Sequence, residues 1–265
     1  MRKWKLFACF ILFAGLFYSL PVYSQIPWPD KPKNLQVFPK EMKIDRLKNI
    51  MFAFSNALGV NCIHCHVADD FRDFSTYDFA SDKNVNKKKA RIMLKLVQSI
   101  NKNSIKEIAA LSDEKNPVSV NCTTCHRGYK KPIPLEDVIY EVIKKTGIKS
   151  GIDEYHKLRE KYYGKGTFNF EDKTLIVVGY KLLGEKAAQD AVAVLKLNTE
   201  VNPGSANAFD SLGDAYVALG DYKNAIASAE KCIDLLDNVI KIDDSFHNNI
   251  RKSAQDKIDK FKDKM

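Results

Sequence analysis

Two short motifs in this chain combine thiols with an imidazole at a spacing that suits one kind of metal-containing cofactor. Residues 62–66 read CIHCH and residues 122–126 read CTTCH, so each Cys-x-x-Cys pair is followed at once by His. Two thiols three residues apart on a turn of helix can each form a thioether with one vinyl group of a porphyrin, and the adjoining imidazole can bind its iron. The motifs therefore predict two covalently bound c-type haems. Cys62 and Cys65 would attach one haem, with His66 on its iron. Cys122 and Cys125 would attach the other, with His126 on its iron.

Zinc binding and disulfide formation are the competing roles for the same cysteines. Two Cys-x-x-Cys pairs could hold zinc in a tetrahedral site, and an oxidising compartment would permit disulfides. Neither role requires His directly after both pairs, and the whole chain contains only 5 histidines. The pattern therefore favours haem. His64 occupies a variable position of the first motif, and we expect it at the surface or at the edge of the haem pocket rather than on the iron.

A helix must present the ligand on the far side of the first iron. Apolar residues recur at three- and four-residue intervals between Pro39 and Gly59, which predicts a helix that ends at this glycine. Met51 lies on the apolar stripe, eleven residues before Cys62. Met is a usual sixth ligand of c-type iron, but a Met on an apolar stripe also suits a protein core. The periodicity alone leaves both roles open.

A second predicted helix, residues 87–100, lies between the two motifs. It carries Met93, our candidate for the sixth ligand of the second haem. The alternative for Met93 is core packing with Ile92, Leu96 and Val97. The alternatives for the iron are His156, Met42 or an open coordination site.

The start of this second helix is strongly basic. Lys87, Lys88, Lys89 and Arg91 fall within five residues, and a charge run of this kind is usually a solvated face. Arg91 is the best placed of them to bind a haem propionate, because a guanidinium can donate two parallel hydrogen bonds to a carboxylate.

Three stretches of the chain resemble a known family. They are FPKEMKIDRLKNIMFAFSNALGVNCIHCH, SDKNVNKKKARIMLKLVQSIN and VNCTTCHRGYKKP. Together they are similar to the cytochrome subunit of photosynthetic reaction centres, in particular to the half of that four-haem subunit that carries its last two haems. The resemblance covers Phe38 to Pro134 and includes a helical Met upstream of Leu-Gly-Val-x-Cys, a helix opening with Lys-x-x-Ala-Arg-x-Met, and Cys-His-Arg-Gly.

The resemblance implies a ligand and a general activity. In that family the upstream helical Met binds the iron of the next haem, which implies Met51 for the haem at His66. The last haem of the four-haem subunit takes its distal His from the other half of the protein, and this chain has no such half. The resemblance implies single-electron transfer between redox partners, with photosynthetic and respiratory use both open.

The amino-terminal residues predict export. A basic start is followed by an almost wholly apolar run to Leu20 and a bend at Pro21. This is the layout of a secretory signal peptide, residues 1–24, with an uncleaved membrane anchor as the alternative. We expect a protein of the periplasm, membrane-associated if this segment is retained. The formal net charge falls from +9 to +6 without it, and haem propionates would offset much of the rest, so nucleic acid is not an expected partner.

The second half of the chain has a different pattern. Residues 135–146 can form a helix, and residues 149–166 are rich in Gly, Lys and Tyr, which suits a connector. From Thr174 onward a 34-residue period appears, similar to tetratricopeptide repeats. The recurring positions are Leu175, Val178, Gly179, Leu182, Ala191 and Leu195, matched by Phe209, Leu212, Gly213, Tyr216, Ala225 and Ala229. Residues 240–262 suit a helix that caps the stack.

These observations predict an all-α protein. We expect a signal peptide in residues 1–24, a dihaem cytochrome c domain in 25–134, a helix and connector in 135–173, and two tetratricopeptide-like repeats with a capping helix in 174–265. The leading function is an exported electron carrier without catalytic residues. Its expected partners are redox proteins, including a membrane redox complex, and a protein or peptide at the repeats. A dihaem peroxidase or reductase with an open second haem, and an interaction subunit of a larger redox complex, are the alternatives.

Overall fold

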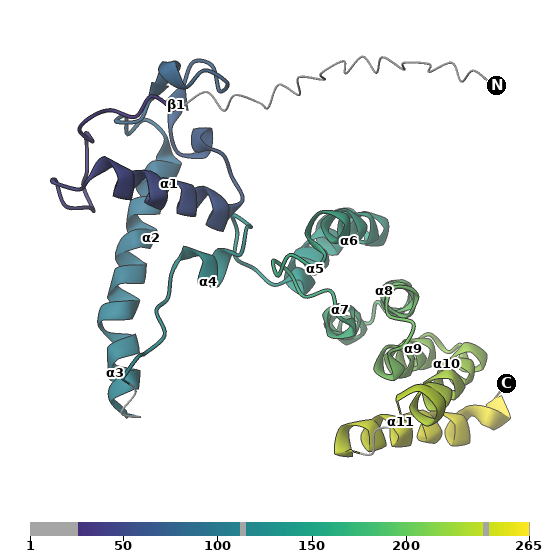
Figure 1. The fold of residues 1–265 in the computed structure, drawn as a ribbon. Coiled ribbons are helices and arrows are strands. Elements are labelled where there is room, and N and C mark those ends of the chain that lie inside the picture. The colour runs from purple at the N-terminus through teal and green to yellow at the C-terminus, as the bar shows by residue number, and fades with distance from the viewer. Residues whose placement is uncertain (1–25, 112–114, 241–243, 265) are drawn as a thin grey trace, which may run out of the picture. The chain divides into compact units, whose positions relative to one another are not determined.

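The computed structural model describes residues 26–111, 115–240 and 244–264, so the predicted signal peptide lies outside the described residues. Helices make up 68% of the structure and strands 2%, which confirms the all-α class (Figure 1). Each helix within the described ranges is too short or too polar to cross a membrane. The chain divides into two compact units, one formed by the described residues of 1–49 and 62–95, the other by those of 50–61 and 96–265.

The first unit contains the loops around the first Cys-x-x-Cys-His motif. Its elements are the start of α1 (Ile44–Leu58), η1 (Cys62–His64), β1 (Val67–Ala68), η2 (Phe74–Thr76), β2 (Tyr77–Asp78) and the start of α2 (Val85–Lys102). The two strands pair antiparallel, Val67 with Asp78 and Ala68 with Tyr77. Helix α1 begins five residues later than the sequence suggested, because residues 39–42 instead close a turn in which the Met42 N–H donates to the Pro39 oxygen.

The second unit contains the remaining helices. They are α3 (Ser104–Leu111), α4 (Cys122–His126), α5 (Leu135–Thr146), α6 (Ile148–Tyr162), α7 (Asp172–Gly184), α8 (Ala188–Val201), α9 (Ala206–Leu219), α10 (Tyr222–Leu235), a π-helical turn at Leu236–Ile240 and α11 (Ser245–Phe261). A final 3-10 turn spans Lys262–Lys264. The bounds of α5 confirm the helix predicted over residues 135–146.

The prediction of a connector over residues 149–166 is wrong for most of this segment. Helix α6 occupies it as far as Tyr162 and buries Tyr155 and Leu158 completely or nearly so. Gly151 lets α6 approach α5, since a Cβ at this position would lie 2.3 Å from a side-chain carbon of Ile143. The Gly, Lys and Tyr content that suggested a loop therefore belongs to an amphipathic helix, and only residues 163–171 connect it to α7.

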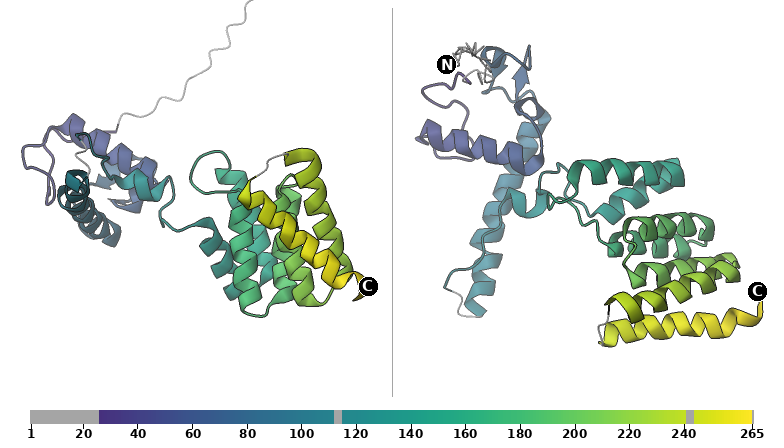
Figure 2. Two further views of the ribbon diagram at one scale, coloured as in Figure 1. Left: turned by 90° about the horizontal axis from the view of Figure 1, so that it is seen from below. Right: turned by 45° about the vertical axis from the view of Figure 1, so that its right-hand side comes forward.

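The helices from α7 to α10 repeat at the predicted interval. Helices α7 and α9 begin 34 residues apart at Asp172 and Ala206, and α8 and α10 do the same at Ala188 and Tyr222. Each helix packs against the next along the chain (Figure 2). Their assignment as tetratricopeptide repeats stays a prediction. The expected capping helix corresponds to α11, and residues 241–243 lie outside the described ranges.

Two apolar clusters hold the helices after Leu135 together. The larger joins α5 to α9 and includes Leu135, Tyr155, Leu175 and Leu195, all at most 1% exposed. The smaller joins α9, α10 and α11 around Cys232 and Ala254. Between residues 26 and 134, by contrast, only three described residues are buried apolar ones, and α2 has no buried residue at all. The three are Leu47, Ala57 and Ala109.

Candidate haem sites

The first motif forms a single helical turn. The backbone N–H groups of Cys65 and His66 donate to the oxygen of Cys62 at 3.2 and 3.0 Å, so Cys62 and Cys65 are separated by one turn as two thioether bonds to one porphyrin require. Both cysteines are half-buried, and burial raises the pKa of each thiol. The surroundings thus favour an uncharged sulfur, which is the charge state of a thioether.

Two asparagines at the start of α2 hold this turn in place. The amide of Asn84 donates to the backbone oxygens of Ile63 and His64 at 3.3 and 3.2 Å, and that of Asn86 donates to the His64 oxygen at 3.0 Å. Asn84 also accepts from the backbone N–H of Asn86 and so caps the helix. The start of α2 therefore fixes the carbonyls between the two cysteines.

The imidazole of His66 lies in an aromatic and largely dry setting. The Phe79 ring meets it edge-on at 5.1 Å between centroids, and Trp28 and Tyr77 stack on Phe79. Burial, assisted by the charge of Lys87, lowers the pKa of His66 to about 4. The neutral imidazole is the form that binds iron. Its buried Nδ1 makes no hydrogen bond of normal geometry, and the nearby Phe79 backbone opposes part of the lowering of the pKa.

The second motif is a short helix with strong local capping. Asn121 accepts from the backbone N–H groups of Thr123 and Thr124, and the Thr124 hydroxyl accepts from the Asn121 N–H, which completes a capping box around α4. Upstream, Asn101 at the end of α2 bonds to both backbone groups of Val120, at 2.7 and 2.8 Å. Asparagine side chains thus position this motif as they do the first.

The hydrogen bond of His126 assigns its tautomer. Its Nδ1 lies 3.1 Å from the backbone oxygen of Tyr129, and a carbonyl oxygen can only accept, so the proton of the neutral ring is on Nδ1. Nε2 then keeps a free lone pair. Iron-binding histidines are commonly oriented in this way by a bond from the second ring nitrogen, and His126 fits the role of proximal ligand.

Backbone contacts on both sides anchor the second motif. The Gly128 N–H donates to the Ala57 oxygen at 2.8 Å, and a Cβ on Gly59 would lie 2.1 Å from the Gly128 oxygen. On the other side, the Thr167 hydroxyl donates to the Arg127 oxygen at 2.7 Å. The ring of Tyr129 also packs against those of Tyr162 and Phe168. The end of α1 and the loop before α7 therefore fix the Arg-Gly-Tyr that follows His126.

The apolar residues near the motifs suit contact with a porphyrin. Helix α2 exposes Val85, Ile92, Met93 and Leu96, which recur along one side of the helix, and their exposed fractions range from 40% to 67%. Core packing was the alternative for Met93; Met93, Ile92 and Leu96 are exposed and Val97 is half-buried, so the side chains of the protein alone do not bury this group. Met51 is half-buried on α1. Iron binding by either sulfur stays a prediction, as does a role for Met42 (half-buried) or His156 (exposed).

Arg91 has a protein partner of its own. Its guanidinium lies 2.8 Å from the Asp82 carboxylate and 3.4 Å from the Asn34 oxygen, and only 13% of its side chain is exposed. Gln36 also donates to Asp82, at 3.0 Å. Arg91 thus fastens the amino-terminal segment and the loop before α2 to this helix. Contact with a propionate stays a prediction and would have to share the guanidinium with Asp82.

The described cysteines are all free, at positions 62, 65, 122, 125 and 232. Within the described ranges, no three side chains of His, Cys, Asp or Glu gather closely enough to hold a metal ion between them.

Comparison with known proteins agrees with the motifs. Residues 29–133 and 74–153 match the family described as photosynthetic reaction centre cytochrome C subunit. Over these residues, just under half of its length, the chain is similar to that family. A photosynthetic reaction center cytochrome c subunit of Rubrivivax gelatinosus (strain NBRC 100245 / IL144) is 27% identical over 95 residues. The match covers 34% of this chain and 24% of the relative, so the chain corresponds to about a quarter of that protein.

This similarity agrees with a cytochrome whose haem is covalently bound. Several residues that hold the motifs were not predicted from the sequence: Asn84, Asn86, Asn101, Tyr129 and Thr167. Asn121 and Thr124, three residues apart at the start of a helix, were a recognisable capping signal. The remaining contacts join residues at separations of up to 40 positions, and no local pattern indicates them.

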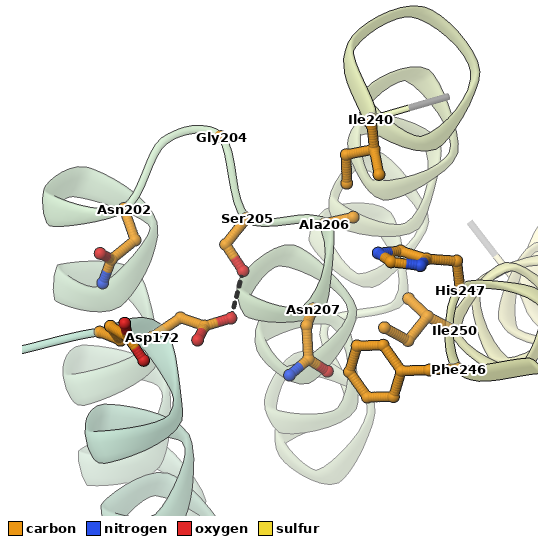
Figure 3. Close-up of a pocket in the computed structure, with 11 residues that line it drawn as sticks. Asp172, Asn202, Gly204, Ser205, Ala206, Asn207, Ile240, Phe246, His247 and Ile250 are labelled. Carbon is orange, nitrogen blue, oxygen red and sulfur yellow. Dashed lines mark hydrogen bonds between the residues drawn. The ribbon is translucent and has the colours of Figure 1, made fainter. Parts of the chain in front are cut away.

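A pocket of about 450 Å³ lies among the later helices (Figure 3). Asp172, Ser205 and Asn207 form part of its wall, together with Phe246 and His247 from α11. The Ser205 hydroxyl donates to the Asp172 carboxylate at 2.5 Å, and Phe246 is 56% exposed. The pocket therefore combines carboxylate and amide groups with an accessible aromatic ring.

Proposed function

We propose that this chain is a dihaem c-type cytochrome that carries single electrons between redox partners. One haem is attached through Cys62 and Cys65 with His66 on its iron, and the other through Cys122 and Cys125 with His126. The observation that carries the proposal is the pairing of each motif with an imidazole in a defined setting: the Tyr129 oxygen orients His126, and the Phe79 ring packs against His66. Bound haem supplies an iron that changes oxidation state by one electron.

The protein's own residues would orient and insulate these irons. The aromatic group around His66 excludes water from one side of the ring, and the Tyr129 carbonyl keeps His126 in one orientation. Met51 would be the second protein ligand of the first iron, and Met93 that of the second. A Met ligand would favour the reduced state and raise the potential.

The proposal includes export to the periplasm with a redox complex as partner. It is supported by the signal-like pattern of residues 1–24 and by a relative named as a reaction centre subunit. We propose electron exchange with a membrane redox complex, of photosynthetic or respiratory type.

A haem count tests the main proposal. Protein matured in a host that attaches c-type haem should give two haems per chain by pyridine haemochrome and a mass increase of two haems under denaturing conditions. Cys62→Ala with Cys65→Ala, and separately Cys122→Ala with Cys125→Ala, should each reduce the count to one. A colourless wild-type protein from a host that matures other cytochromes would refute the proposal.

The distal ligands need a separate measurement. Met51→Leu and Met93→Leu should each convert one haem from a low-spin to a high-spin absorption spectrum. A second haem that is already high-spin in the wild type, and that shifts on addition of cyanide, would instead favour the open-site alternative with peroxidase activity.

The pocket in Figure 3 favours a second role, the binding of a partner protein or peptide by α7–α11. Phe246 is the residue to test, because an exposed aromatic ring at a pocket rim is a common anchor for a partner. Phe246→Ala should abolish cross-linking to the redox complex, whereas Leu219→Ala, which removes a similarly exposed side chain from α9, should retain it. Equal cross-linking by both variants would argue against this role.

A further inference from the structure

The side chain of Lys87 is held by three acceptors of one loop. Its Nζ donates hydrogen bonds of 2.8 Å to the backbone oxygens of Phe79 and Ser81 and lies 3.5 Å from the Asp82 carboxylate. Only 14% of the side chain is exposed, whereas lysines are among the residues least often buried. The neighbouring Lys88 and Lys89 are exposed, so Lys87 differs from the rest of the basic run.

This loop connects Lys87 to the first motif. Lys87 binds the backbone of Phe79, and the ring of the same residue contacts the imidazole of His66. The residue before Lys87 contacts the motif as well, since the Asn86 amide donates to the His64 oxygen at 3.0 Å. The start of α2 that carries Lys87 is therefore close to the first motif.

We propose that Lys87 is a positioning residue for His66 and that its fixed positive charge raises the reduction potential of the haem attached at Cys62 and Cys65. This inference rests on the proposed function, because it requires haem at this motif. According to this inference, Lys87, which lies outside the Cys-x-x-Cys-His pattern, contributes to the reduction potential of the haem.

The electrostatic argument follows from the charge balance of reduction. A donor protein gives up one electron and is oxidised, the site gains that electron, and no bond breaks. The oxidised site is more positive by one unit, so a cation at a fixed distance destabilises it relative to the reduced site. Asp82 offsets part of this charge, but it also pairs with Arg91 at 2.8 Å, which is shorter than its distance to Lys87. The effect of Lys87 is thus only partly cancelled.

Redox titration of the haem-loaded full chain tests the proposal. In Lys87→Gln, the reduction potential of one of the two haems should fall by about 59 mV. This shift corresponds to a tenfold change in the equilibrium constant for one-electron reduction. Lys87→Arg retains the charge and should keep that transition within about twofold of wild type. Lys88→Gln removes the same charge from an exposed neighbour on the helix and should change either transition by less than about twofold.

Two results would overturn the proposal. One is an unchanged potential in Lys87→Gln with both haems attached, and the other is an equal shift in Lys88→Gln. If Lys87→Gln fails to incorporate haem, Asp82→Asn provides the opposite test. Asp82→Asn removes a negative charge 3.5 Å from Lys87 and should raise the reduction potential of the same haem. An unchanged potential in this variant would also overturn the proposal. Absence of haem from the wild type would instead refute the proposed function.

Discussion

From Leu135 onward the helices bury large apolar side chains against one another, whereas the helices before Leu135 leave almost all of theirs partly or fully exposed. Tyr155, Leu175 and Leu195 are 0% exposed in the later part, while Ile92 and Leu96 on α2 are 67% and 49% exposed in the earlier part. Both parts have well-formed helices. The difference lies in what covers the apolar faces of those helices.

In the earlier part the protein's own tertiary contacts are mainly polar or made by the backbone. Asn84, Asn86 and Asn101 hold the motif segments, Arg91 and Asp82 fasten the amino-terminal loop, and Gly59 meets Gly128 through the backbone. Such contacts fix geometry, but each adds little net stability. If haem binds as proposed, the earlier part would depend on it for its apolar core.

Removal of haem should have the largest effect and should separate the two parts. The variant with Cys62, Cys65, Cys122 and Cys125 all changed to Ala should lose hydrogen-exchange protection in residues 30–134, because too little apolar surface is buried there without porphyrin. Helices α5–α11 should keep their protection. Peptide-level exchange by mass spectrometry measures both in one sample, and wild-type-like protection of α1 and α2 in this variant would contradict the comparison.

Loss of the buried Lys257 should have the opposite regional effect. Its Nζ lies 2.8 Å from Asp210 and 2.7 Å from Asp214, and its side chain is 8% exposed. Lys257→Met leaves Asp210 buried without its cation and should destabilise α9–α11 by about 3–5 kcal/mol, with unchanged haem spectra. Lys252→Met on the same helix removes an exposed pair with Asp256 and should cost less than about 1 kcal/mol. Exchange rates in α9–α11 compare the two variants.

The pH dependence of this pair gives a further check. Burial alone would lower the pKa of Lys257, but Asp210 and Asp214 reverse the shift and raise it above 10.5. The stabilisation is therefore fully present below pH 10.5 and is lost as the pH rises through the folded-state pKa. Burial also raises the pKa of Asp210. In Lys257→Met this pKa should rise further, because Lys257 lowers it in the wild type. The variant should accordingly lose less stability near pH 4, where Asp210 can take up a proton, than at pH 7.

Gly59 tests the backbone contacts of the earlier part. It has a φ of +63°, and a Cβ would lie 2.1 Å from the Gly128 oxygen, so Gly59→Ala combines left-handed strain with a backbone clash. We expect destabilisation of the haem-loaded protein by about 2–4 kcal/mol. Gly164→Ala has a similar φ of +73° and nothing within 4 Å of the Cβ, so it should cost only about 1–2 kcal/mol. Equal denaturation midpoints for the two variants would show that the close approach is unimportant.

The same comparison explains which features could be predicted from the sequence. The two motifs and the 34-residue interval depend on local spacing, and spacing is fully visible in a sequence. The helix α6 was missed because Tyr155 and Leu158 are apolar positions within a segment rich in Gly and Lys. The roles of Lys87 and Tyr129 depend on backbone carbonyls brought near by loops, and a carbonyl has no residue identity that a sequence pattern can reveal.

Leu96 and Leu219 form the most direct test of what covers the earlier helices. The two side chains are 49% and 45% exposed, on α2 and α9 respectively, so protein contacts alone predict nearly equal and small effects of Leu→Ala. If porphyrin covers the exposed side of α2, Leu96→Ala should destabilise the haem-loaded protein by about 1–2 kcal/mol more than Leu219→Ala, because it then removes buried apolar surface. Denaturant titrations of both variants with haem attached measure this difference. Equal midpoints would mean that α2 faces solvent even in the cytochrome, and the core of the earlier part would then have to come from another surface.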